Sequence, residues 1–366
     1  MNDILFHLEK LPVDARDFLH DKVFGTIPPL NIPNVDFSVS ALPTIILNQI
    51  NTDFCTAFSS SDLNTAIQLS DFSLVNYLNK LGLSPSVLYR GQLAVKYNLL
   101  PTVDSYISLA KDGQNGAINL AILKNLIVEK GDNFCPLYQM AKIKQVRGEY
   151  LSYGANLRDA CNALVKYGSL PRNKSPYTLM EGKPTDKDRN FLANWLNWDK
   201  ALDFIASKYK LGTFFAVNGA YDAFDNCRSA LYQNKDTSHA GVLFGLNWRP
   251  EWTFAPNGVI SDSSYTTPTS NGHCVQFVGQ KIINGVPYLV LPNTWGEGYG
   301  EKGFYYFSRE VVNKEALAGY GAFTFKKMTL GQAQFYLANG IMASDNIFVK
   351  GFKTLLGYLK NYGTRQ

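Results

Sequence analysis

The sequence predicts an α+β fold, because helical patterns fill its first two thirds and β-prone runs follow them. Apolar residues recur at helical spacing in residues 157–167 and 222–232. After residue 271 the pattern changes to two apolar, β-prone runs, 272–279 and 286–292. The pair Asn284-Gly285 separates these runs, and Asn-Gly is the strongest short signal for a hairpin turn. We therefore expect helices first and an antiparallel hairpin near the end.

Composition limits the classes of protein that fit this chain. Its 366 residues suit one large domain or two modest ones, and 46% hydrophobic content is ample for a core. The net charge of +5 is mild and scattered, so nucleic-acid binding is not expected. Five cysteines and four histidines form no CxxC pair and no metal-ligand spacing, so we expect neither a metal nor another cofactor.

The N-terminal residues do not resemble a secretory signal peptide, because Asp3, Glu9 and Lys10 interrupt any apolar stretch. No run approaches the ~18 apolar residues of a membrane-spanning helix. Cysteines without a disulfide framework indicate a reducing compartment. We therefore expect a cytoplasmic or virion-associated protein that is not exported through Sec.

The predicted hairpin brings two polar residues to one end. His273 begins its first strand and Asn293 follows its second, so the two lie opposite each other or one diagonal step apart. The amide oxygen of Asn293 would accept a hydrogen bond from the imidazole of His273 and fix its tautomer. A catalytic base needs that control, so the pair is a candidate for general-base chemistry.

A nucleophile for this base is predicted at Cys55. The residues from Cys55 to about Leu69 show a helical pattern, and Asn51, Thr52 or Asp53 would cap it. Backbone N–H groups and the helix dipole favour a thiolate in a first turn. A lone cysteine at a helix start is more often a buried core thiol, but the distant His–Asn hairpin favours the nucleophile.

These motifs together resemble the papain/cathepsin family of cysteine peptidases. The resemblance rests on Gln49 with Cys55 six residues later, on Gly272-His273 and on Asn293-Thr294-Trp295-Gly296. The segment Ser84–Tyr89 is similar to a helix start of bacterial members. The resemblance implies two lobes, one helical and one a β-barrel, with a protein or peptide substrate in the cleft between them.

The resemblance also implies a role for each residue. Cys55 would be the nucleophile and His273 the acid and base. Asn293 would orient His273, and Trp295 would cover that hydrogen bond.

Two further contacts with the substrate follow from the same resemblance. The side-chain amide of Gln49 and the backbone N–H of Cys55 would form an oxyanion hole. Gly154 would belong to a wall that pairs with the substrate backbone.

The spacing of these residues predicts insertions. His273 lies 218 residues after Cys55 and Asn293 lies 238 after it, whereas the family usually needs ~130–150. The excess fits extra segments near 99–150 and 228–268.

The predicted organisation has four parts. They are an N-terminal arm at 1–43, a helical lobe at 44–185, a β-barrel lobe at 186–330 and a C-terminal extension at 331–366. Residues 347–362 are apolar with three lysines and no acid. This pattern predicts a helix that caps the body, or a basic amphipathic helix that binds a membrane surface or an assembly partner.

Departures from the family favour a second hypothesis, an inactive papain-fold scaffold such as a phage virion or assembly component. The family has Gly-Ser before its cysteine and Trp after it, whereas this chain reads Asp53-Phe54-Cys55-Thr56. Phe54 is bulky beside the expected substrate. The charge of Asp53 would raise the pKa of a neighbouring thiol.

A different base and a different enzyme class both fit less well. His239 also precedes a β-prone run, but no Asn-Gly hairpin and no Asn-Thr-Trp-Gly box follow it at the right distance. A compact Cys-His-Asn cell-wall amidase would place its cysteine and histidine much closer in sequence. Thr52 stands where secreted family members carry a bridging cysteine, so all five cysteines are expected as free thiols.

Overall fold

A computed structural model describes eleven parts of the chain: residues 8, 28–38, 46–49, 52–69, 100–102, 105, 108–109, 133–178, 185–234, 241–261 and 272–323. Several predicted features lie outside these residues. They are the segment Ser84–Tyr89, the competing base His239 and the C-terminal helix at 347–362.

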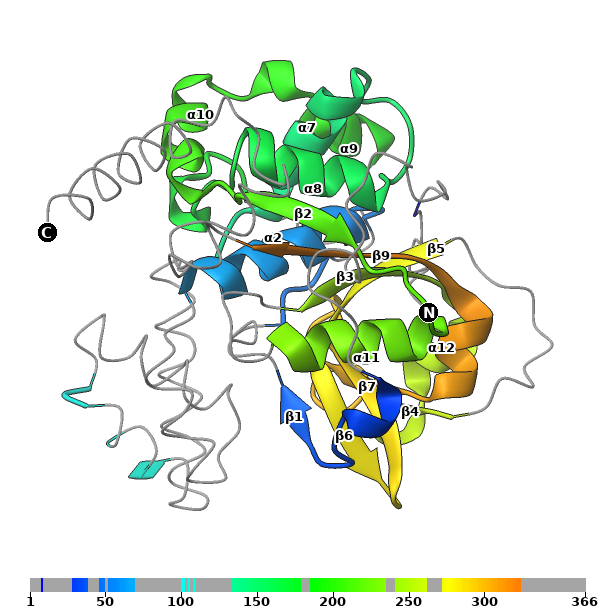
Figure 1. Ribbon diagram of the computed structural model, residues 1–366. Coiled ribbons are helices and arrows are strands. Elements are labelled where there is room, and N and C mark those ends of the chain that lie inside the picture. Colours follow the sequence, from blue (N-terminus) through cyan, green and yellow to red (C-terminus); the bar gives the residue numbers. More distant parts are fainter. Residues whose placement is uncertain are drawn as a thin grey trace, which may run out of the picture.

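The helical lobe is built around a buried helix, α2 (Cys55–Leu69). Every side chain of α2 from Cys55 to Ile67 is buried, because the helix is covered on several sides. It packs against α7 (Pro136–Arg147), α8 (Leu157–Lys166) and the β-lobe strand β5. Figure 1 shows α2 between the helices gathered at the top and the strands below.

Local signals explain where the helices of this lobe begin and end. Asn156 caps α8 by accepting a hydrogen bond from the backbone N–H of Asp159 at 2.8 Å. Thr185 and Asp188 form a reciprocal capping box at the start of α9 (Asp186–Ala193). The lobe also contains α10 (Ala201–Ala206) and the short 3₁₀ helices Arg172–Lys174, Trp195–Asn197 and Ser207–Tyr209.

The β-lobe contains two sheets in the described part of the chain. The four-stranded sheet has the order β2 (Thr213–Ala216), β9 (Ala316–Phe323), β3 (Val242–Asn247) and β5 (Gly272–Phe277), all antiparallel. The five-stranded sheet has the order β1 (Phe37–Ser38), β6 (Gly279–Ile283), β7 (Val286–Pro292), β8 (Phe304–Phe307) and β4 (Val259–Ile260). Two 3₁₀ helices, Pro250–Phe254 and Pro256–Gly258, precede β4.

The predicted Asn-Gly turn is confirmed, with one difference in the strands around it. Asn284 and Gly285 have φ of 50° and 79°, and Ile283 pairs with Val286 across the turn. The expected first strand is divided at Val278. Its first half, β5, joins β3 in one sheet, and its second half, β6, pairs with β7 in the other.

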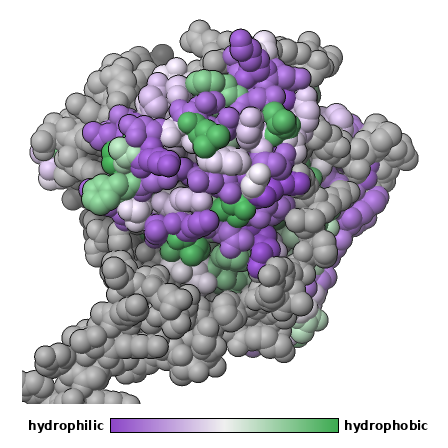
Figure 2. Space-filling view, turned by 90° about the horizontal axis from the view of Figure 1, so that it is seen from above, coloured by the Kyte–Doolittle hydropathy of each residue, from purple (hydrophilic) through white to green (hydrophobic). Residues whose placement is uncertain are grey.

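Figure 2 looks down on the helical lobe and shows hydrophobic residues as separate spots among hydrophilic ones. The large hydrophobic side chains exposed in this lobe include Leu151, Leu196 and Phe204. Scattered exposed hydrophobic residues are ordinary on a protein surface. Among the described residues, no helix is long and apolar enough to cross a membrane.

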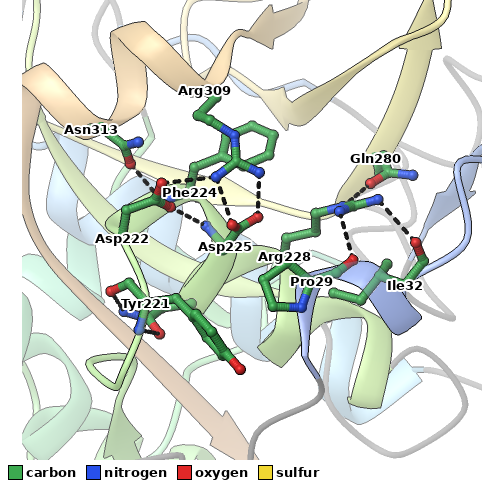
Figure 3. A network of polar contacts seen from close by, with 11 residues as sticks. Pro29, Ile32, Tyr221, Asp222, Phe224, Asp225, Arg228, Gln280, Arg309 and Asn313 are labelled. Atoms are coloured by element: carbon green, nitrogen blue, oxygen red, sulfur yellow. Dashed lines mark hydrogen bonds and ion pairs between the residues drawn. The ribbon is translucent and has the colours of Figure 1, made fainter.

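Two helices cover the β-lobe and anchor part of the predicted N-terminal arm. Arg309 on α12 (Arg309–Glu315) forms ion pairs with Asp222 and Asp225 at the start of α11 (Ala223–Asn234). Arg228 on α11 contacts Gln280 and the backbone oxygens of Pro29 and Ile32, as Figure 3 shows. The arm, which includes the 3₁₀ helix Pro29–Asn31, therefore continues into β1 on the edge of the sheet.

Helices α9 and α10 pack with the helices of the first lobe. Leu192, Trp198 and Ala206 belong to the buried cluster that also contains residues of α2, α7 and α8. The boundary expected between residues 185 and 186 stays a prediction. The insertion expected near 99–150 includes α7, which is a core helix of the same lobe.

Candidate active site

The contact expected between His273 and Asn293 is present. Nε2 of His273, on β5, lies 3.0 Å from Oδ1 of Asn293, directly after β7, and both side chains are buried. Oδ1 of Asn293 also accepts the backbone N–H of Thr294 at 2.7 Å. A carbonyl oxygen only accepts, so the proton between these two side chains sits on Nε2. That tautomer leaves Nδ1 as the basic nitrogen of the ring.

Two tryptophans hold the imidazole in place. Trp295 stacks on His273 with ring centroids 5.0 Å apart and an interplanar angle of 23°. Trp248 meets the same imidazole edge-on at 5.1 Å and meets Trp295 at 4.9 Å. Trp295 was predicted to cover this hydrogen bond, whereas Trp248 had no sequence motif to mark it.

Burial controls the charge of His273. It lowers the pKa of the imidazole to about 4, and the hydrogen bond with Asn293 opposes that shift only in part. The ring is therefore neutral at neutral pH, which is the form that accepts a proton. The burial of the ring thus favours the neutral imidazole over the charged one.

Cys55 is the first residue of α2, as predicted, but two of the expected caps, Thr52 and Asp53, bind elsewhere. The third, Asn51, lies outside the described residues. The backbone oxygen of Phe54 accepts the N–H of Phe58, which places Phe54 at the N-cap position. Thr52 donates its hydroxyl to the backbone oxygen of Gln49, and both carboxylate oxygens of Asp53 bind residues outside the helix. Neither side chain therefore competes for the first-turn N–H groups, which favour an anion.

The helix of Cys55 and the strand of His273 lie side by side. Ser59, one turn after Cys55, donates its hydroxyl to the backbone oxygen of Cys274 at 2.9 Å. Burial raises the pKa of the Cys274 thiol, and a charge on Cys55 raises it further. Cys274 is therefore a poor nucleophile beside this site. An approach of Cys55 Sγ to the imidazole within ~6 Å stays a prediction.

Gln49 is tied to both sides of the site. Its backbone N–H donates to the oxygen of Thr294 at 2.7 Å, and its side-chain oxygen accepts the hydroxyl of Thr294 at 2.6 Å. Its Nε2 donates to the backbone oxygen of Thr52 at 2.8 Å. An amide nitrogen carries two hydrogens, so Nε2 retains donor capacity for an oxyanion. The neighbouring residue Asn48 forms an antiparallel bridge with Trp295.

Gly154, the predicted wall residue, lies beside the start of α2. Its φ of +64° is left-handed, which glycine adopts at little cost. Its N–H donates to the carboxylate of Asp53 at 2.5 Å, so this donor is not directed at a substrate. The next residue, Ala155, forms a backbone bridge with Leu8, and a contact of Gly154 with the substrate stays a prediction.

Leu8 lies between this wall and the strand of His273, a position that the sequence did not predict. It forms a parallel bridge with Ala155 and an antiparallel bridge with Gly272, to whose oxygen its N–H donates at 2.5 Å. The side chain of Leu8 is buried against Gly245, which has no side chain to displace it. Leu8 thus pairs with residues on both sides of it.

No group of three or more histidine, cysteine or carboxylate residues suited to a metal occurs among the described residues. All five cysteines are buried as separate thiols. A thiol and a neutral imidazole are the groups that nucleophilic attack on a carbonyl uses, and Cys55 and His273 supply one of each.

Part of the chain is similar to known cysteine proteases. Residues 157–323 match the family model described as papain family cysteine protease. Thiol protease aleurain from Arabidopsis thaliana is 40% identical over 160 residues, which are 43% of this chain and 39% of that protein. Pro-cathepsin H from Bos taurus is 31% identical over 72 residues, 19% of this chain and 22% of that protein. The chain therefore spans about two fifths or less of these relatives.

A solved structure shares the fold. Xylellain, a cysteine protease from Xylella fastidiosa, superposes with a TM-score of 0.54 at 16% identity, covering 87% of this chain and 96% of that one. At this identity the likeness concerns the fold alone, and it confirms the predicted α+β, papain-like fold. The family model and the relatives support the resemblance drawn from the motifs.

Proposed function

We propose, from the premise that residues 157–323 match the papain family, that this protein is a cysteine peptidase acting through Cys55, His273 and Asn293. The observation that carries the proposal is the buried hydrogen bond between His273 and Asn293 beside the helix that begins at Cys55. The substrate is a protein or peptide whose backbone would extend between Ala155 and Gly272, where Leu8 pairs now.

The proposed reaction has two halves. Nδ1 of His273 accepts the thiol proton as Sγ of Cys55 attacks the peptide carbonyl carbon. The imidazolium then gives that proton to the leaving amine, and an acyl-thioester remains on Cys55. In the second half His273 takes a proton from water, the hydroxide attacks the thioester, and the thiol is restored. Asn293 holds the ring in one tautomer throughout.

The negative charge that develops on the substrate oxygen needs donors. The backbone N–H of Cys55 and Nε2 of Gln49 are the proposed oxyanion hole, and the first turn of α2 adds its dipole. Gln49 is held by Thr52 and Thr294, so its amide is already oriented before substrate binds.

The structure explains the residues that had favoured an inactive scaffold. The side chain of Phe54 is buried in the core of the helical lobe. The carboxylate of Asp53 pairs with Arg189 at 2.9 Å, so its charge is balanced. Thr56 donates its hydroxyl to the oxygen of Ala155 at 3.1 Å. These contacts support the peptidase over the scaffold.

The test is labelling and cleavage with the intact chain. A thiol-directed activity probe should label Cys55 alone, and a fluorogenic peptide mixture should be cleaved by the wild type but not by Cys55→Ala. Cys274→Ala is the matched control, because it removes a neighbouring buried thiol. If the probe does not label Cys55 and no peptide is cleaved, the proposal is overturned in favour of the scaffold.

A further inference from the structure

Buried charged side chains hold the segment Ser152–Ala155, which faces Leu8. Nζ of Lys144, on α7, donates to the backbone oxygen and the hydroxyl of Ser152, both at 2.8 Å. The backbone N–H of Ser152 in turn donates to Glu149 at 3.0 Å. The first residue of the segment is therefore fixed to α7.

Asp53 holds the next part of the segment. One carboxylate oxygen binds Nη1 of Arg189 at 2.9 Å, and the other accepts the N–H of Gly154 at 2.5 Å. The side chain of Asp53 is 2% exposed and that of Arg189 is 6% exposed. A charge this deeply buried is retained only with a close partner, so each group depends on the other.

Arg189 reaches the same segment from α9. Its guanidinium lies over the ring of Tyr153, 4.0 Å from the centroid, and its Nη2 binds Asp186 at 2.9 Å. The hydroxyl of Tyr153 donates to that same Asp186 at 3.1 Å. Arg189 therefore joins three elements: α9, the segment around Tyr153 and the residues just before Cys55.

The contacts on either side of Cys55 reach consecutive residues of the segment. Asp53, two residues before Cys55, binds the N–H of Gly154, and Thr56, directly after it, binds the oxygen of Ala155. The position of Cys55 relative to this segment is therefore fixed, because residues on both sides of Cys55 are hydrogen-bonded to the segment.

We propose that Asp53 and Arg189 are positioning residues that fix Gly154 and Ala155 relative to Cys55, so that a substrate backbone paired with Ala155 presents its carbonyl to the thiol. This inference rests on the proposed function. Misplacing a substrate by ~1 Å costs roughly a hundredfold in rate. The link consists of an ion pair and a hydrogen bond, so it forms without any oxidation of the chain.

The decisive variant is the double substitution Asp53→Asn/Arg189→Met. It removes both charges together, so neither is left buried alone, and the net charge around Cys55 is unchanged. We expect amide hydrogen exchange of residues 152–156 to become about tenfold faster and KM for a peptide to rise about tenfold, while kcat falls less. Alkylation of Cys55 by iodoacetamide, which does not use the wall, should stay within about threefold of the wild type.

Two further variants keep the test falsifiable. Arg189→Lys retains the positive charge, so its KM should lie between that of the wild type and that of the double variant. Asp225→Asn breaks a comparable ion pair with Arg309 on the β-lobe (Figure 3) and should change neither exchange at 152–156 nor KM.

The proposal is overturned if the double variant and Asp225→Asn show the same amide hydrogen exchange at residues 152–156 and the same KM. If the wild type cleaves no peptide, the proposed function fails, and exchange at residues 152–156 alone decides whether Asp53 and Arg189 hold the segment.

Discussion

Nε2 of His273 and Oδ1 of Asn293 lie 3.0 Å apart, although the two residues belong to different sheets. His273 lies on β5 of the four-stranded sheet, and Asn293 directly follows β7 of the five-stranded sheet. The chain divides the first predicted strand at Val278, so β5 turns away from the hairpin while His273 remains above the end of β7. The polar pair is therefore enclosed by both sheets and by Trp295, which accounts for its complete burial.

Replacing Asn293 by Ala should lower kcat by roughly tenfold to a hundredfold with a smaller change in KM. The ring of His273 would lose the acceptor that selects its tautomer, while the substrate contacts stay. Steady-state kinetics with a fluorogenic peptide measures the effect. Asn313→Ala is the control, because Asn313 accepts a backbone N–H on the β-lobe surface. Equal kinetics in the two variants would contradict the orienting role.

The stability of the folded protein should fall as the pH is lowered from about 6.5 towards 4. The folded-state pKa of His273 is about 4, below the usual 6.5, so the unfolded chain binds more protons in that window. The stabilising contribution is complete above pH 6.5 and amounts to about 3 kcal/mol. Urea unfolding of the wild type and of His273→Gln between pH 4 and 7.5 measures it. Parallel curves for the two proteins would refute the buried neutral imidazole.

Alkylation of Cys55 separates two views of Asp53. If the charge of Asp53 acts directly on the thiol, any variant that removes it should alkylate faster. If the ion pair with Arg189 balances that charge, Asp53→Asn should be faster because Arg189 is left unpaired, and Asp53→Asn/Arg189→Met should resemble the wild type. His273→Ala should be slower in either case. We expect the second result, in which the double variant is labelled like the wild type. The rate of iodoacetamide labelling, measured as a function of pH, tests it.

All five cysteines should react as free thiols under denaturing, non-reducing conditions. Each of them is a separate buried thiol in the structure, and Thr52 occupies the position of the usual bridging cysteine. Quantitative thiol titration of freshly purified protein counts them, and a reduced sample sets the maximum. Three or fewer reactive thiols would show that a disulfide forms.

Leu8→Asp should increase the initial rate of peptide cleavage roughly tenfold, because burying a leucine contributes ~1.5–3 kcal/mol to docking of its segment. Leu8 now pairs with Ala155 and Gly272, where a substrate backbone would extend. Leu30→Asp is the control, since Leu30 is 98% exposed. Thermal melts of both variants show whether the fold is retained. A rate for Leu8→Asp no higher than that for Leu30→Asp would mean that Leu8 does not compete with substrate.

The sequence predicted the parts of this structure that depend on local chemistry. Asn284-Gly285 specifies its turn through residues that tolerate positive φ, and Cys55 begins a helix where the pattern changes. The proximity of His273 and Asn293 followed from the hairpin, even though the strand between them divides.

Long-range packing explains what the sequence did not predict. The central strand β9 is rich in glycine and alanine, which are weak strand formers. Its glycines are needed because a Cβ on Gly319 or Gly321 would lie within 3 Å of the rings of Phe244 or Phe215. The pairing of Asp53 with Arg189 joins residues 136 positions apart, and no local signal announces such a contact.

The bond between Thr294 and Gln49 spans 245 residues, which places the assembly of this site late in folding. A ribosome that has released Cys55 still has more than two hundred residues to synthesise before Asn293 emerges. During that interval the nascent chain carries the thiol without the histidine, its asparagine or the strand that orients Gln49. If Cys55, His273 and Asn293 act together as proposed, the thiol therefore has no base until residue 293 has been synthesised and folded.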